Sequence, residues 1–183
     1  MNGMSLRRQA AHFGAVLLSW PVEQYIAAQG DRLARAGVAI APALTEEFRG
    51  WFSADLLESV RIVASGDLQL PALPFESILR RFGMDMPGAQ FAAAMTFENV
   101  VAVREDHPPA RLLFHELVHV AQYRLLGKAA FARLYVRGFL TEGSYERIPL
   151  ERCAWALEER FATRRDTFSV EEAVASWVER DLF

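Results

Sequence analysis

Apolar residues recur at helical spacing near both ends of the chain, which predicts that both end regions are helical. In the N-terminal region we expect a helix over 5–28, a second helix that begins at Pro42, and a short helix capped by Ser53. In the C-terminal region we expect helices over 110–126, 128–139 and 149–165, and a last helix that Ser169 and Glu172 begin as a capping box.

The middle of the chain changes to the alternating pattern of β-strands. Residues 59–64 alternate and are rich in β-branched side chains, and segments 91–97 and 100–104 indicate a hairpin around the polar turn Glu98-Asn99. A short helix is expected over 75–82. Because no long crossover helix separates the strands, we expect a small antiparallel or mixed sheet and favour antiparallel pairing. The predicted fold class is therefore α+β.

Composition narrows the class of protein. The chain has 183 residues, of which 52% are hydrophobic and 23% charged, a balance typical of one globular domain over 1–183. The net charge of −3 argues against nucleic-acid binding. The single cysteine, Cys153, excludes an internal disulfide and a cysteine-rich zinc ribbon. No apolar run has the 18 or so residues of a membrane span.

The N-terminus carries a short apolar stretch at 13–20, after two arginines, that is faintly similar to a signal peptide. Pro21 interrupts the stretch and an amphipathic pattern continues beyond it, so we interpret residues 1–57 as an N-terminal helical segment. Without a convincing signal peptide, we expect a cytoplasmic or otherwise unaddressed protein.

The chemistry-bearing motif is His-Glu-x-x-His at 115–119, within the predicted helix 110–126. Positions i and i+4 of a helix lie about 40° apart in projection, so His115 and His119 point the same way and can bind one Zn²⁺ ion. Glu116 is rotated by about 100° and can face water on the metal instead of ligating it. This predicts Glu116 as the general base that takes the proton of that water.

A zinc site needs a third protein ligand, and no histidine follows His119. Glu151 is the preferred candidate because Pro149 begins its helix and Ala154 leaves room for two helices to approach. The alternative explanation for Glu151 is the helix dipole, which favours a carboxylate in the first helical turn whether or not it binds a metal. The alternatives are the carboxylates of Glu142, Glu146, Glu158 and Glu159, and the imidazoles of His107 and His12.

These residues resemble known zinc peptidases. His115, His119 and a distant helical Glu151 are similar to the thermolysin-like ligand set of the gluzincins. The Thr-x-x-Asn strand at 96–99 and the Leu-Leu pair before the motif resemble the peptidase core domain found with bacterial extracellular contractile injection systems. The Pro-Leu-Glu segment at 149–151 resembles the third-ligand segment of related bacterial proteins. The resemblance covers about 59–160 and implies a zincin-like fold with a metallopeptidase core over 58–165.

The resemblance implies a zinc-dependent metallopeptidase that hydrolyses peptide bonds, with a peptide or protein as substrate. Tyr145 is the first candidate for stabilising the oxyanion, and Tyr135 the second. Gln122 can orient a neighbouring group, and the strand 100–104 can lie along the edge of the cleft. The alternative function is a non-catalytic zinc-binding or scaffold module of a larger bacterial secretion or toxin assembly.

Overall fold

The computed structural model describes residues 3–64, 92–164 and 166–181, with side chains from residue 13 to residue 180 within these ranges. This part of the chain is α+β and mostly helical, with a three-stranded mixed sheet, so the predicted fold class is confirmed at that level. The elements are α1 (Gly3–Ala34), α2 (Pro42–Phe48), α3 (Ala54–Ser59), β1 (Arg61–Ala64), β2 (Ala94–Phe97), β3 (Val100–Val103), α5 (Ala110–Leu126), α6 (Lys128–Glu142), the 3-10 helix η2 (Tyr145–Arg147), α7 (Pro149–Thr163) and α8 (Val170–Asp181).

The predicted helices are confirmed, and their ends have the expected caps. The Ser53 hydroxyl accepts the Leu56 N–H at the start of α3, and the Ser169 hydroxyl accepts the Glu172 N–H at the start of α8. Helix α1 is longer than the expected 5–28. Among the described helices, none has a segment that is both long and apolar enough to cross a membrane. The helix expected over 75–82 lies outside the described residues.

The sheet has the order β1-β3-β2 and is mixed. Strands β2 and β3 form the predicted antiparallel hairpin, but β1 pairs with β3 in parallel, so the favoured all-antiparallel arrangement is wrong. The hairpin reverses the chain once between β2 and β3, and the long segment between β1 and β3 is sufficient for the crossover that a parallel pair needs. The hairpin turn holds Glu98 at φ 57°, and its carboxylate pairs with Lys128 Nζ at 3.0 Å.

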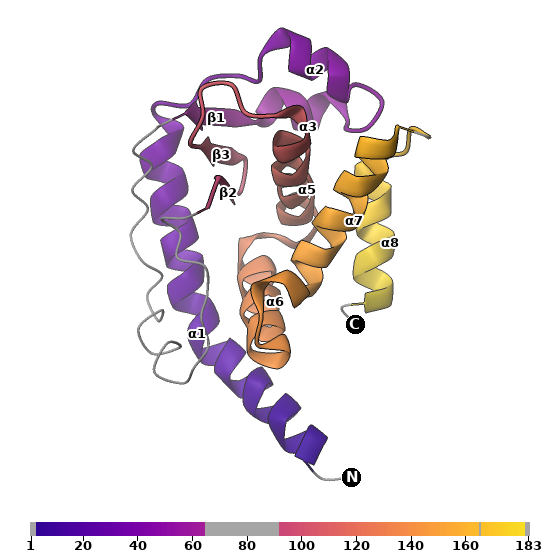
Figure 1. Ribbon diagram of the computed structural model, residues 1–183. Coiled ribbons are helices and arrows are strands. Elements are labelled where there is room, and N and C mark those ends of the chain that lie inside the picture. The colour runs from indigo at the N-terminus through magenta and orange to yellow at the C-terminus, as the bar shows by residue number, and fades with distance from the viewer. Residues whose placement is uncertain (1–2, 65–91, 165, 182–183) are drawn as a thin grey trace.

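The sheet lies between α1 and α5, as Figure 1 shows. All four residues of β3 are buried, which is expected for a central strand covered on both faces. Helix α5 continues through the middle of the molecule, with α7 and α8 beyond it and α6 below (Figure 1). This arrangement brings α5 and α7, the two helices that carry the candidate metal ligands, into contact.

An aromatic cluster joins α5 to α7. The Phe114 ring stacks on Phe161 with centroids 4.3 Å apart, and Trp51 meets both rings edge-on. Phe48, at the end of α2, also packs against both. Phe114 directly precedes His115 on α5. Packing of the buried rings therefore fixes how close this part of α5 lies to α7, and with it the position of His115.

Two helical glycines test how closely the helices approach. A Cβ at Gly138 of α6 would lie 2.8 Å from Pro149 Cδ, at the start of α7, whereas a Cβ at Gly30 of α1 would meet nothing closer than 3.6 Å. We therefore expect Gly138→Ala to lower the free energy of unfolding by about 1–3 kcal/mol through overpacking. Gly30→Ala should raise it by up to about 1 kcal/mol, because alanine favours the helix. Denaturant unfolding measures both, and equal stabilities of the two variants would contradict the close α6–α7 approach.

Candidate metal centre

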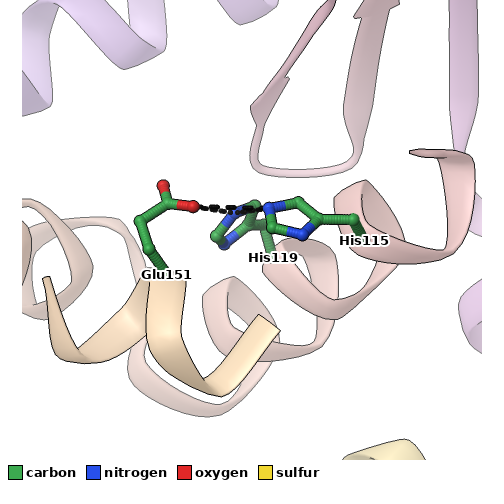
Figure 2. Close-up of side chains that lie close together, drawn as sticks. All are labelled: His115, His119 and Glu151. Atoms are coloured by element: carbon green, nitrogen blue, oxygen red, sulfur yellow. Dashed lines mark hydrogen bonds and ion pairs between the residues drawn. The ribbon is translucent and has the colours of Figure 1, made fainter. Parts of the chain in front are cut away.

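Three buried side chains from two helices converge on one point. His115 and His119 lie one turn apart on α5, and Glu151 lies in the first turn of α7. Their exposed fractions are 6%, 6% and 2%. Figure 2 shows the Glu151 carboxylate directed at both imidazoles. The structure thus brings together the three residues predicted as metal ligands, in a geometry that can hold a metal ion.

The spacing of the donor atoms fits a metal ion. The Nε2 atoms of the two histidines are 3.2 Å apart, and Glu151 Oε2 lies 3.3 Å from His115 Nε2 and 3.4 Å from His119 Nε2. Two bonds of about 2.0–2.1 Å that meet at the tetrahedral angle separate their ligand atoms by about 3.3–3.4 Å. All three sides of the triangle agree with this value, so one ion at normal bond length can contact all three atoms.

Hydrogen bonds on the far side of each ring point both Nε2 lone pairs at that spot. His119 Nδ1 lies 2.8 Å from Gln122 Oε1, and the Gln122 amide donates to the Leu150 carbonyl oxygen at 2.9 Å. His115 Nδ1 lies 3.0 Å from a Glu158 oxygen. Both partners can only accept here, so each Nδ1 carries a proton, and it is Nε2 that can lose its proton and bind a metal ion.

The charges around the site attract a cation. Burial alone would lower the pKa of His115, but hydrogen bonds to Glu151 and Glu158 outweigh it and raise that pKa to about 10. Burial also opposes protonation of His119, yet the charge of Glu151 raises its pKa. Burial disfavours the ionised Glu151 too, and the neighbouring histidines nonetheless hold its pKa below its usual value. The site therefore stabilises positive charge at its centre, whether as protons or as a metal ion.

Glu116 lies beside the triad without joining it. Its Oε2 accepts a hydrogen bond from the Thr96 hydroxyl of β2 at 2.6 Å, and the side chain is 6% exposed. Burial raises the pKa of Glu116, although the two histidines and the Thr96 hydrogen bond act in the opposite direction. A buried carboxylate next to a candidate metal position is suited to accept a proton from water and pass it on.

Two tyrosines lie on the opposite side of Glu151. The Tyr135 hydroxyl of α6 donates to Glu151 Oε1 at 3.0 Å, which fixes the oxygen that faces away from the histidines. The Tyr145 ring packs against Trp155. Burial and the nearby Glu151 raise the pKa of Tyr145, so its hydroxyl stays protonated and remains a donor. Both hydroxyls are thus engaged at Glu151: Tyr135 donates to its Oε1, and Tyr145 is hydrogen-bonded with Glu151 and Tyr135.

The triad, Glu116 and both tyrosines line one cavity of about 620 Å³. Strand β2 and the residues before it form part of its wall. We expected strand 100–104 at the cleft edge, and this is wrong: β3 is central and buried, whereas β2 ends the described sheet and lines the cavity. The reason is that β3, the second strand of the hairpin, pairs with β1, so the first strand, β2, lies at the edge.

The other candidate ligands do not reach the centre. Among the described residues, no His, Cys, Asp or Glu besides the triad joins the metal-binding group. His107 and Glu146 are exposed, Glu159 binds Arg111, and Glu142 lies outside the group; the side chain of His12 is outside the described part. Cys153 is buried and does not belong to the metal-binding group.

Sequence reasoning missed two residues of this site. Glu158 was weighed only as a ligand, but it holds His115 from behind and is itself held by Arg111. The sequence shows Thr96 only as part of a motif, whereas in the structure its hydroxyl donates a hydrogen bond that orients the Glu116 carboxylate. The seven-residue spacing of Glu151 and Glu158 on one helix was the available signal, because it places both on the same face. The orienting role suggested for Gln122 agrees with its two hydrogen bonds.

Comparisons with known proteins identify no relative: no family model matches the chain, and no curated protein or solved structure matches it significantly.

The Glu158 contact predicts a measurable effect on metal affinity. We expect Glu158→Ala to weaken metal binding about 10–100-fold, because His115 loses the acceptor that orients its ring and makes Nε2 more basic. Glu159→Ala is the matched control. Glu159 follows Glu158 on α7 and also binds Arg111, but it is not a partner of His115. Competition with a chelating dye measures both affinities. Equal weakening in the two variants would show that the effect does not pass through His115.

Proposed function

We propose that the chain is a zinc-dependent peptidase. The observation that carries this proposal is the buried His115–His119–Glu151 triangle with Glu116 beside it in the same cavity. Zinc sites of enzymes have three protein ligands and one position left open, whereas structural sites have four. Three ligands that face a cavity favour the enzyme.

Zinc is the metal that this donor set favours. Ca²⁺ and Mg²⁺ prefer cages of oxygen atoms, whereas two imidazoles and one carboxylate are common zinc ligands. The resemblance of the motif to the gluzincin ligand set supports the same choice. When bound, zinc supplies Lewis-acid chemistry: it makes water acidic near neutral pH and polarises a carbonyl group.

Glu116 performs the proton transfers in this proposal. Thr96 occupies Oε2 of Glu116, so Oε1 is the oxygen that receives the proton of the attacking water. The same oxygen then returns the proton to the leaving amine of the peptide. Burial favours the first of these steps, since it raises the pKa of Glu116 and makes its carboxylate a better proton acceptor.

The substrate is proposed to lie in extended form along β2. Within the described sheet, β2 pairs with β3 alone, and it lines the cavity next to Glu116. An exposed strand edge offers main-chain hydrogen bonds to an extended peptide. The Tyr145 hydroxyl is proposed to donate to the oxygen that becomes negative during the reaction.

Metal content is the first measurement. Elemental mass spectrometry of the purified protein should find about one zinc per chain, and His115→Ala and Glu151→Ala should each lose it because a ligand is removed. Gln24→Ala, an exposed position on α1, is a control that should keep its zinc. Absence of zinc after reconstitution of the wild type would contradict the proposal.

Loss of the base separates catalysis from metal binding. Glu116→Gln should keep the zinc and lower the rate of peptide hydrolysis about 10²–10⁴-fold, the usual contribution of a general base. A quenched fluorescent peptide library is a suitable substrate mixture. Zinc binding by the wild type without cleavage of any library member would instead support the non-catalytic scaffold function.

A further inference from the structure

Side chains of α1 and α6 form an apolar wall of the cavity, and neither helix carries a candidate metal ligand. Leu18, Val22 and Ile26 face it from α1, and Val136, Phe139 and Leu140 face it from α6. On α1 these positions are four residues apart, so they form one stripe along the helix. We call these six side chains the apolar compartment.

The stripe that α1 contributes to the apolar compartment is longer than one side chain. Residues 18 to 26 of a helix span about 12 Å at 1.5 Å per residue. An extended peptide advances about 3.3 Å per residue, so three or four consecutive residues match this length. The whole cavity of about 620 Å³ is within the usual range of ligand sites.

Among the described side chains, charge lies on the metal side of the cavity. The charged side chains that line it come from α5 or α7 in this part of the chain, and none comes from α1 or α6. Of these, Arg111 and Glu158 are paired with each other. A charged or strongly polar group placed in the apolar compartment would lose water without gaining a partner, whereas an apolar group would gain contacts.

The backbone beside the compartment favours a polypeptide over a fatty acyl chain. The residues before and within β2, Ala92 to Phe97, line the same cavity. A strand at the end of the described sheet recognises peptide N–H and C=O groups, which an acyl chain lacks.

We infer that the apolar compartment binds a run of three or four apolar residues next to the bond that is cleaved, and that α1 is part of the substrate site. This inference rests on the peptidase function proposed above. It assigns the specificity of that function to α1, a helix outside the segment that carries the resemblance to known peptidases.

Binding to a protein that cannot turn over tests the inference without relying on activity. The protein is full-length, zinc-loaded Glu116→Gln, and the probes are acetyl-Gly-Gly-Leu-Phe-Leu-amide and its polar match acetyl-Gly-Gly-Ser-Gln-Ser-amide. Calorimetry should give at least tenfold tighter binding of the apolar peptide. An equal affinity for the two peptides would overturn the inference.

Adjacent positions on α1 provide a matched control. Leu18 is half-buried and lines the cavity, whereas Leu17 is 60% exposed on another face. Adding Leu18→Ser should weaken the apolar peptide at least threefold, and adding Leu17→Ser should leave it unchanged. Leu140→Ser, on the opposite wall and also half-buried, should reproduce the loss. Equal effects of Leu17→Ser and Leu18→Ser, with both variants folded by circular dichroism, would overturn the assignment.

Two further outcomes separate this inference from the proposed function. If the apolar peptide binds selectively but wild-type protein cleaves no peptide, peptidase function fails and the binding assignment stands. If wild-type protein cleaves peptides without preference for neighbouring apolar residues, the inference fails and the peptidase function stands. Displacement of the peptide by equimolar dodecanoate would show an acyl-chain pocket and overturn the polypeptide assignment.

Discussion

The geometry of the candidate metal centre depends on the buried amide of Gln122. This side chain is fully buried, donates to the Leu150 carbonyl at 2.9 Å and accepts from His119 Nδ1 at 2.8 Å. A buried polar group without a partner costs about 1–3 kcal/mol, so both bonds are needed at once. One side chain thereby ties α5 to the residue before Glu151 and sets the proton position on His119. The aromatic cluster of Phe114 and the tight approach at Gly138 hold the same helices from two other sides.

The same burial explains why the site suits a divalent cation. Glu116 and Glu151 are both buried within reach of two imidazoles, and no lysine or arginine lies among the principal charges that act on them. Buried charges are costly unless they are paired, and the histidines meet this need only by becoming protonated, as the raised pKa values of His115 and His119 show. A metal ion bound here would replace those protons and satisfy all three ligand atoms together, which would couple metal binding to the stability of the fold.

Local rules predicted the parts of the site that one helix determines. Helix α5 begins after Pro109 and ends at Gly127 as expected, and the i, i+4 spacing alone directs His115 and His119 to one side. Glu151 was preferred because of Pro149 and the small Ala154, which is fully buried, and it is the residue that reaches the histidines. The roles of Glu158 and Thr96 depend on how α7 and β2 cross α5, and the parallel β1–β3 pairing depends on a long connection. Those arrangements are set by packing between distant segments, which spacing along the chain does not encode.

The sequence pattern of α1 gives no sign that this helix lines the candidate site, and the structure shows the reason. It is apolar on two faces: Leu18, Val22 and Ile26 line the cavity, and Phe13, Leu17 and Trp20 are exposed on another side. Two apolar stripes cancel the periodic signal that normally identifies the face that packs against a core. Only the position of α1 beside α6 distinguishes the two stripes (Figure 1). One stripe lines the cavity and the other is exposed. A helix that lies before the recognisable motifs can therefore belong to the same cavity as the metal ligands, because the cavity is bounded by neighbours in space, not by neighbours in sequence.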